Sequence, residues 1–329
     1  MYDVVALGEL LIDFTPAGVS PAGNTLFERN PGGAPANVLS AVSKLGGTGA
    51  FLGKVGNDQF GLFLKSVLEQ NGIGTRGLKF SPDVHTTLAF VQLDEHGDRS
   101  FSFYRKPGAD MTLAPEDLEL GLIDEARIFH FGSLSLTDEP ARSATKAALE
   151  YARKKGKVVS YDPNWRPPLW ENDAQAKQAM LSVLPYADIL KVSEEELAFL
   201  TGETDIRAGG DWFLRQGAKI VVVTLGPRGC YFCSAAGSAF RETYDTKIVD
   251  TTGSGDCFFG AMLAQLAGRR DPLDSISEEE LEHMVDFANA AGALCATRKG
   301  AISSMPDRRA IEACMHSVPL LHLKSAEAD

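Results

Sequence analysis

The stretch VDTTGSGDCFFGAMLA, residues 249–264, carries the most specific pattern in the sequence. Gly253 and Gly255, together with small hydroxyl residues, precede Asp256, and an apolar run with the period of a helix follows. The first backbone N–H groups of a helix have no partner within it, and the helix dipole makes that end positive. The segment therefore predicts a phosphate-binding helix start, with a carboxylate beside it.

Asp256 itself allows two interpretations. Acidic residues are common in the first turn of a helix, where they need no function. A carboxylate beside a bound phosphate can instead accept the proton of an attacking hydroxyl group. Because a helix start stabilises negative charge, we expect the pKa of Asp256 to stay low and the group to remain ionised.

A second glycine-containing segment, NPGGAPANVLSAVSKLGG at residues 30–47, precedes and enters another predicted helix. Gly32 and Gly33 leave room for a ligand to approach bare backbone. Asn37 is a poor residue for a helix interior, and its amide can both donate to and accept from sugar hydroxyls. The alternative is a Gly-Gly turn followed by an incidental asparagine.

Outward from these segments, β-rich runs alternate with segments of helical period through most of the chain. This order is typical of an α/β fold, in which helices cover both faces of a mainly parallel sheet. The expected strands are 3–7, 50–53, 127–131, 157–161, 188–192 and 219–225, and the clearest helices are 34–45, 59–71, 139–155, 194–200 and 255–267.

One segment breaks this alternation. Residues 87–104 form two extended runs around the turn residues 94–98, which predicts an antiparallel hairpin. With the early stretch 11–27, the hairpin would make a small separate sheet over the edge of the main domain. Such a sheet could serve as a lid, and the alternative is an ordinary surface hairpin.

Composition excludes several classes of protein. The chain has 329 residues, of which 44% are hydrophobic and 23% charged, as in globular proteins with a substantial core. A net charge of -12 repels a polyphosphate backbone, so nucleic acid is not expected as a partner. There is no signal peptide and no apolar run of the ~18 residues that span a bilayer, so we expect a cytoplasmic protein without membrane contact.

The five cysteines are Cys230, Cys233, Cys257, Cys295 and Cys314, an odd number that favours a reducing compartment. Cys230 and Cys233 form a C-x-x-C pattern, but GCYFC has the character of a strand. Positions three apart on a strand point to opposite faces, so we expect structural roles rather than a redox or zinc pair. The histidines show no paired spacing for a transition metal.

Two nucleotide-binding motifs can be rejected. GIGTRG, residues 72–77, matches G-x-G-x-x-G, but a helix enters it and a strand leaves it, the reverse of the dinucleotide-binding order. Gly72 is therefore expected to cap that helix. No Walker A loop is present, because Lys54 is followed by Val55 rather than by Ser or Thr.

Together, the two glycine-containing segments resemble a known family. NPGGAPANVLSAVSKLGGTGAFLGKVGNDQFG (30–61) resembles the N-terminal signature of the ribokinase-like PfkB carbohydrate kinases, and DTTGSGDCFFGAML (250–263) resembles their C-terminal signature. The likeness covers essentially the whole chain, and other segments follow in the family's order. GELLIDF, FYRKPGAD, YDPNWRPPLW and ADILKVSEEELAFLTG look most like the fructokinases of this family.

The resemblance implies one PfkB kinase domain over residues 1–329. Its fold would be a Rossmann-type three-layer α/β sandwich with a small β-sheet lid, formed by insertions at about 11–30 and 85–108. The implied activity is ATP-dependent phosphorylation of a sugar hydroxymethyl group with Mg²⁺, and fructose is the sugar that we expect. Apart from the resemblance, an apolar lid face bearing Phe101 and Phe103 is a reasonable dimer surface, so we expect a homodimer through the lid.

Carried over by position, the resemblance implies four groups of site residues. Asp256 would be the catalytic base, beside an anion hole at Gly253, Ser254 and Gly255. The sugar would contact Asp13, Gly32, Gly33, Asn37, Arg105 and Arg166. The nucleotide would contact Lys191, Glu196, Thr224, Gly226, Gly229 and Asn289. A monovalent cation, K⁺ by preference, would lie among Asp250, Thr252, Cys295, Arg298, Gly300 and Ser304, mostly on backbone oxygens.

Two departures and two alternatives accompany this assignment. The anion hole has GSGD where the family commonly has GAGD, and Ser193 stands where the N-x-x-E motif has Asn. Arg105 and Arg166 could clamp a sugar-acid carboxylate, which would make the protein a 2-keto-3-deoxygluconate kinase. A catalytically silent sugar or nucleotide sensor on the same fold is the alternative from another class.

Overall fold

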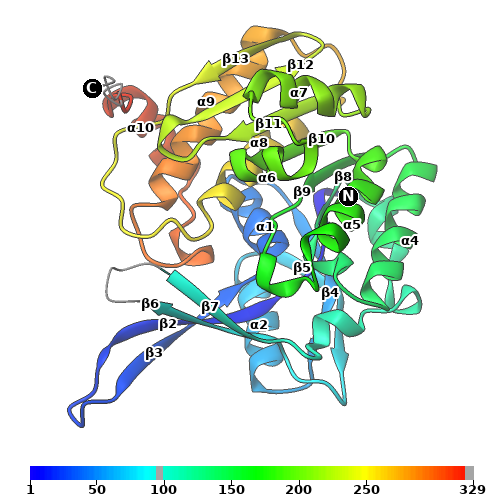
Figure 1. Ribbon diagram of the computed structural model, residues 1–329, viewed down its shortest axis with the longest axis vertical. Helices are drawn as coiled ribbons and strands as arrows, with labels where there is room; N and C mark the ends of the chain where they lie inside the picture. Colours follow the sequence, from blue (N-terminus) through cyan, green and yellow to red (C-terminus); the bar gives the residue numbers. More distant parts are fainter. Residues whose placement is uncertain (94–98, 323–329) are drawn as a thin grey trace.

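The computed structural model describes residues 1–93 and 99–322, so the turn expected at 94–98 lies outside the described part. Two β-sheets of unequal size make up the fold, and helices cover both faces of the larger one (Figure 1). The α/β class and the separate small sheet expected from the sequence are both confirmed.

The main sheet has nine strands in the order β13-β12-β11-β10-β9-β8-β1-β4-β5. All neighbouring strands of this sheet are parallel except in the pairs β11–β12 and β12–β13, which are antiparallel. The bounds are β1 Tyr2–Leu7, β4 Gly49–Gly56, β5 Ile73–Ser81, β8 Ala126–Gly132, β9 Val158–Asp162, β10 Ile189–Ser193, β11 Ile220–Thr224, β12 Cys230–Ser234 and β13 Gly237–Arg241.

The helices form a layer on each face, because successive side chains of a strand point to opposite sides. In β1, Val4 and Ala6 pack against α1, α8 and α9, whereas Val5 and Leu7 belong to the core under α3 and α4. The bounds are α1 Ala34–Lys44, α2 Gln59–Gln70, α3 Leu120–Asp124, α4 Ala141–Lys154, α5 Asp173–Val183, α6 Glu194–Thr201, α7 Ile206–Arg215, α8 Ser254–Ala267, α9 Glu278–Cys295 and α10 Arg308–Ser317.

The small sheet has the order β3-β2-β6-β7, with bounds β2 Leu11–Val19, β3 Thr25–Gly32, β6 Leu88–Leu93 and β7 Arg99–Tyr104. Pairs β2–β3 and β6–β7 are antiparallel, and β2–β6 is parallel. Figure 1 shows these strands projecting to one side of the main body, with the β2–β3 hairpin reaching furthest. The antiparallel hairpin expected at 87–104 is therefore confirmed.

Aromatic side chains gather on one face of the small sheet. Phe14 and Phe90 stack with ring centroids 4.8 Å apart, and Phe27 and Tyr104 meet Phe90 edge-on. Tyr104 and Phe103 are neighbours on β7 and point to opposite faces. Phe103 lines the pocket described below, so the expectation that it lies on an outward dimer face is wrong. The side chain of Phe101 lies outside the described part.

Two of the smaller expectations hold. Cys230 and Cys233 are free, buried and on opposite faces of β12, each within a different core cluster. Gly72 follows the C-cap residue Asn71 of α2 with a φ of 70°, and β5 begins directly after it. Within residues 1–93 and 99–322, no helix is long and apolar enough to cross a membrane.

Candidate active site

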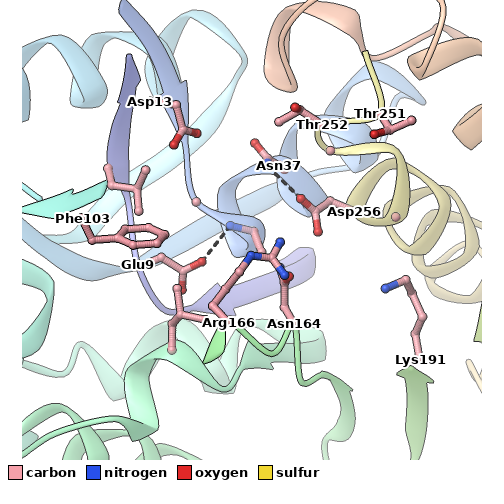
Figure 2. A pocket seen from close by; sticks show the side chains of 16 residues that line it. Glu9, Asp13, Asn37, Phe103, Asn164, Arg166, Lys191, Thr251, Thr252 and Asp256 are labelled. Atoms are coloured by element: carbon pink, nitrogen blue, oxygen red, sulfur yellow. Dashed lines mark hydrogen bonds between the residues drawn. The ribbon is translucent and has the colours of Figure 1, made fainter. Parts of the chain in front are cut away.

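A pocket opens at the carboxyl ends of the central parallel strands, between the main body and the small sheet (Figure 2). Asn37, Lys191 and Asp256 line it from the body, and Asp13 and Phe103 line it from the small sheet. In the main sheet, β1 lies between β8 and β4. From β1 the chain continues to β4 and β5 on one side, and from β8 it continues to β9 and β10 on the other side, so the strand order reverses here. Open α/β sheets bind ligands at such reversals of strand order, so topology alone favours this place.

The start of α8 faces this pocket. Gly253 is the N-cap residue with a φ of 76°, and a Cβ there would lie 2.6 Å from the side chain of Ala301. Ser254 begins the helix, and Gly253, Gly255 and Asp256 all line the pocket. Ser254 donates its N–H to the carbonyl of Thr251 at 3.1 Å. The N–H groups of Gly253 and Gly255 are the ones that can hold an anion here, as the glycine pattern indicates.

Asp256 lies at that helix start, 9% exposed, and accepts a hydrogen bond from Asn37 Nδ2 at 2.8 Å (Figure 2). Burial raises its pKa to about 6, and the negative charge of Asp162 adds to that effect. The hydrogen bond from Asn37 and the positive charges of Lys191 and Arg166 lower it only in part. The expectation of a low pKa is therefore wrong, because loss of hydration outweighs the stabilisation by the helix start.

Asn37 reaches the pocket from α1, where it is 5% exposed. Its Nδ2 is used by Asp256, while its Oδ1 is buried and has no hydrogen-bond partner among the described residues. Buried polar atoms are rarely left in this state, so Oδ1 is suited to accept a ligand hydroxyl. Gly33, with a φ of 116°, lets the chain turn into α1 against the backbone of Glu9, which a Cβ would meet.

Two further carboxyl groups line the same pocket from the start of the chain. Asp13 lies on β2 against Gly32, where a Cβ would collide with its carboxylate, and burial raises its pKa to about 6. Glu9 is 3% exposed, and its Oε1 accepts the N–H of Ala34 at 2.8 Å. Burial raises the pKa of Glu9 to about 7. The sequence analysis missed Glu9, although its position two residues after β1 marks the end of a central strand.

The two arginines expected at the sugar lie in different surroundings. Arg166 lines the pocket, and its positive charge lowers the pKa of Asp13. Arg105 is 4% exposed and its donors are in use: Nε meets Asp110 at 2.7 Å and Nη1 meets Thr137 at 3.0 Å. Its Nη2 donates to the carbonyl of Leu134 at 2.9 Å. The structure therefore does not bring the two guanidinium groups together as a clamp.

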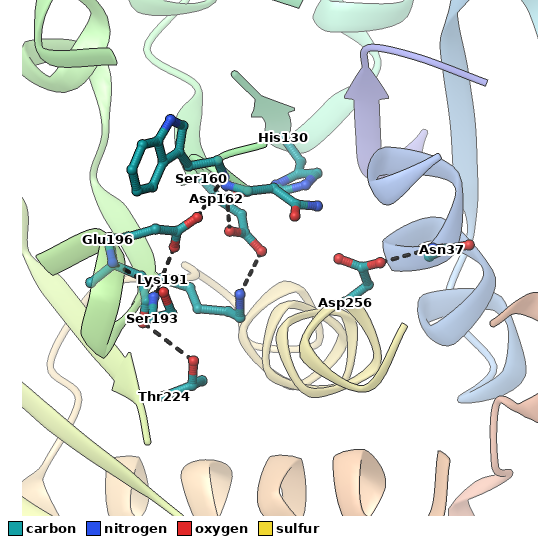
Figure 3. Close-up of polar contacts among 12 residues, drawn as sticks. Asn37, His130, Ser160, Asp162, Lys191, Ser193, Glu196, Thr224 and Asp256 are labelled. Atoms are coloured by element: carbon teal, nitrogen blue, oxygen red, sulfur yellow. Dashed lines mark hydrogen bonds and ion pairs between the residues drawn. The ribbon is translucent and has the colours of Figure 1, made fainter. Parts of the chain in front are cut away.

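On the other side of Asp256, Lys191 Nζ forms a buried ion pair with Asp162 at 2.6 Å (Figure 3). Glu196 accepts the N–H groups of Trp165 at 2.6 Å and Ser193 at 2.8 Å. Ser193 Oγ accepts from the N–H of Glu196 in return, so Ser193 is the N-cap of α6. Asp162, at the end of β9, is the main residue of this region that the sequence analysis missed.

Lys191 also approaches the start of α8. A Cβ placed on Gly255 would lie 3.4 Å from its Nζ, so the cation sits beside the expected anion hole. His130, deeper in the same cluster, meets Ser160 Oγ at 3.1 Å, and burial lowers its pKa to about 4 (Figure 3). His130 is therefore neutral at pH 7, and Lys191 is the cation that faces the carboxylates here.

The remaining residues assigned to the nucleotide do not line this pocket. Thr224 ends β11, and Gly226 and Gly229 bound the short turn after it with φ values of 58° and 83°. Asn289 is 5% exposed on α9, and its Nδ2 donates to the carbonyl of Glu242 at 3.3 Å. Strand β11 is the parallel neighbour of β10, so Thr224 lies one strand away from Lys191 and Ser193.

Residues assigned to the monovalent cation come together in two adjoining loops. Asp250 Oδ1 accepts the N–H of Thr252 at 2.9 Å, and its Oδ2 accepts the N–H of Gly300 at 3.1 Å. Cys295 Sγ meets Ser304 Oγ at 3.0 Å and the carbonyl of Thr252 at 4.0 Å. Within the described residues there is no group of three His, Cys, Asp or Glu suited to a metal. A monovalent cation held by backbone oxygens of these loops therefore stays a prediction, and Arg298 lies in the second loop.

Comparison with known proteins supports this geometry. Residues 1–308 match the pfkB family of carbohydrate kinases. The chain belongs to this family. A protein named probable fructokinase-2 from Arabidopsis thaliana is 46% identical over 308 residues, which cover 92% of each chain.

Solved pfkB structures agree with the fold. A fructokinase from Xylella fastidiosa with bound ATP has a TM-score of 0.87 at 33% identity, covering 96% of this chain and 99% of that one. A double mutant of Vibrio cholerae fructokinase, with bound fructose, ADP and potassium ion, has a TM-score of 0.84 at 34% identity, covering 95% and 98%. This pfkB protein is a fructokinase-like, ATP-dependent sugar kinase.

Proposed function

We propose that the protein transfers the γ-phosphoryl group of ATP to the 6-hydroxymethyl oxygen of D-fructose, giving fructose 6-phosphate and ADP. The observation that carries this proposal is the placement of Asp256 at the open start of α8, in the same pocket as Asp13 and Asn37. An anion cradle, a base and sugar-binding groups thus share one cavity.

In the proposed reaction, the N–H groups of Gly253 and Gly255 hold the γ-phosphate in line with the sugar hydroxyl. The N–H of Ser254 joins them by exchanging its bond to the carbonyl of Thr251 for the phosphate. Asp256 orients that hydroxyl and takes its proton as the new O–P bond forms and the bond to the β-phosphate oxygen breaks. With a pKa of about 6, about nine tenths of Asp256 is ionised at pH 7. The group is therefore a better base than an exposed aspartate and is still in its accepting form.

The nucleotide side supplies charge. Lys191 lies beside the anion cradle and would compensate negative charge on the transferring phosphoryl group. The pKa of Glu196 is raised by burial and by the negative charge of Asp162, and Lys191 and the N–H groups of Ser193 and Trp165 offset that rise in part. A divalent cation fits the remaining negative charge of the two carboxylates. Asp162 and Glu196 would hold Mg²⁺, which would supply further charge neutralisation to the phosphates of ATP.

The charged side chains at the sugar end of the pocket also favour fructose over a sugar acid. The sugar end of the pocket carries the carboxyl groups of Glu9 and Asp13, with Arg166 as its cation. Arg105, the second cation that a carboxylate clamp would need, does not line this pocket, and each of its three nitrogens is bonded elsewhere, to Asp110, Thr137 and Leu134. An anionic sugar would meet two acidic groups and one arginine. This favours a neutral ketose over 2-keto-3-deoxygluconate.

Three further features complete the proposal. The small sheet acts as a lid that closes on the sugar and excludes water. Its aromatic face, with Phe27 and Tyr104 exposed, is the surface of a homodimer. Potassium occupies the loops joined by Asp250 and orders the start of α8. Because all five cysteines are free, the protein acts in the reducing cytoplasm.

The test is ADP release measured with fructose, 2-keto-3-deoxygluconate, ribose and adenosine in parallel, in KCl and in choline chloride. The expected result is rapid release with fructose alone, and faster in KCl. Rapid release with the sugar acid would instead make the protein a 2-keto-3-deoxygluconate kinase. Release with none of them, combined with calorimetric binding of a sugar, would show a sensor. The Asp256→Asn variant controls for a contaminating kinase.

A further inference from the structure

The chain passes between the main body and the small sheet at one buried place. Glu9 lies two residues before β2, Thr87 directly before β6, and Arg105 directly after β7. Ala34, which begins α1 two residues after β3, donates its N–H to Glu9 Oε1. Each of the four strands thus has its end next to the main body within a few residues of this place, which we call the root cluster: Glu9, Thr87, Arg105 and Asp110.

Asp110 connects two of these roots. It belongs to the short 3-10 helix Ala109–Thr112, which is not part of the small sheet. Its Oδ1 accepts the hydroxyl of Thr87, and its Oδ2 accepts Arg105 Nε at 2.7 Å. Thr87 is 1%, Arg105 4% and Asp110 5% exposed, so water cannot replace these contacts. A Cβ on Gly108 would collide with Thr87 and Asp110, which shows how tightly the backbone packs here.

Arg105 extends the connection to the main body. Its Nη1 donates to Thr137 and its Nη2 to the carbonyl of Leu134, both in the segment that follows β8. Leu134 lines the active-site pocket. Phe103, which lies on β7 two residues before Arg105, lines it too. Glu9, another pocket residue, is close enough for Asp110 and Arg105 to act on its charge. The root cluster therefore borders the sugar end of the pocket.

We propose that Asp110 is a positioning residue, which fixes the angle of the small sheet over the pocket by clamping the roots of β6 and β7 to the main body. It does not touch the sugar or the nucleotide. The angle of the sheet sets where Asp13 and Phe103 stand relative to Asp256, so the clamp governs sugar affinity while the nucleotide side is unaffected. The part of this proposal that concerns sugar affinity rests on the proposed function.

Buried contacts of this kind suit the task for a physical reason. A carboxylate that joins a guanidinium and a hydroxyl in a water-free site has a narrow range of geometry. Lid sheets turn about a few residues at the ends of their strands, and small changes there are magnified at the far end. One residue that holds two of these ends can therefore control the whole sheet.

The main test variant is Thr87→Val, which removes one contact of Asp110 and keeps the Arg105–Asp110 ion pair and the side-chain shape. The matched control is Thr145→Val on α4, which removes an equally buried hydroxyl bonded to the carbonyl of Ala141 at 2.8 Å. Asp110→Asn is the stronger variant. It leaves the buried guanidinium without a charged partner, so Thr87→Val decides if Asp110→Asn does not fold.

The first measurement is hydrogen exchange on the ligand-free protein. Thr87→Val is expected to speed exchange of the β6 and β7 amides at least ~3-fold, with α4 and α8 unchanged. The second is steady-state kinetics: the KM for fructose rises about 3- to 30-fold, while kcat and the KM for ATP stay within about 2-fold. The rate of ATP hydrolysis without sugar rises relative to the rate of fructose phosphorylation, because the small sheet no longer closes fully over the pocket and water enters.

Two outcomes would overturn the proposal. The first is hydrogen exchange of the β6 and β7 amides at the wild-type rate in Thr87→Val. The second is equal acceleration of these amides in Thr87→Val and in Thr145→Val, which would mean that loss of any buried hydroxyl loosens the whole protein. The exchange arm needs no sugar, so it still judges the clamp if wild-type protein does not phosphorylate fructose. Failure of the proposed function would appear instead as an inactive wild type whose exchange pattern responds to Thr87→Val as described.

Discussion

The hydrogen bond from Asn37 to Asp256 makes a prediction whose size follows from the structure. Asn37→Leu keeps the approximate shape of the side chain and removes the donor that lies 2.8 Å from Asp256 Oδ2. A hydrogen bond to a charged group contributes about 1.5–3 kcal/mol. Since one pKa unit corresponds to about 1.4 kcal/mol, the pKa of Asp256 should rise by about 1–2 units from its value of about 6.

The consequence is a shift of the acidic limb in the pH profile of kcat/KM. In wild type about nine tenths of Asp256 is ionised at pH 7, whereas a pKa of about 7–8 leaves between about a half and a tenth. Activity of Asn37→Leu should therefore fall more at pH 7 than at pH 9, whatever is lost in sugar contact. The assay is ADP release with fructose between pH 5 and 9, fitted for the pKa of the free enzyme.

A control on the same helix separates this effect from a loosening of α1. Ser40→Ala removes a fully buried hydroxyl bonded to the carbonyl of Ala36 one turn earlier, and it should leave the limb in place. Asp13 also has a pKa of about 6, so Asp13→Asn in both backgrounds shows which group moves. An acidic limb at the same pH in wild type and Asn37→Leu would refute the role assigned to this hydrogen bond.

Three other predictions concern the activity of the base, its effect on stability, and the assembly. Asp256→Asn should lower kcat by at least ~100-fold with sugar binding retained. Above pH 6, the free energy of unfolding of the same variant should exceed that of wild type by up to about 3 kcal/mol. The reason is that the pKa of Asp256 is about 6 in the folded protein and 3.8 in the unfolded chain, so wild type loses stability as the pH rises between those values. An equal free energy of unfolding for the two proteins in urea at pH 7.5 would contradict this. Phe27→Glu, at a ring that is 40% exposed on the small sheet, should turn a homodimer into a monomer by light scattering, and a monomeric wild type at micromolar concentration would disprove the dimer itself.

Local features of the fold were predictable because their causes lie within a few residues. The glycine pattern before Asp256 predicted the start of a helix there, and α8 begins at Ser254. The strand character of GCYFC placed Cys230 and Cys233 on opposite faces of β12, and alternating apolar residues gave the β6–β7 hairpin. Of the residues named from the resemblance, Asp13, Asn37, Arg166, Lys191 and Asp256 line the pocket, and their roles there stay predictions.

What the sequence determined by itself is the set of elements, their order and the chemistry each carries, since backbone conformation and periodicity depend on near neighbours. Only the tertiary structure decided how strongly that chemistry is perturbed. Asn37 and Asp256 are 219 positions apart, and Lys191 and Asp162 are 29 apart. The pKa of Asp256 and the pairing of Arg105 with Asp110 depend on loss of water and on charges brought together across the fold, and neither is written in any local stretch of residues.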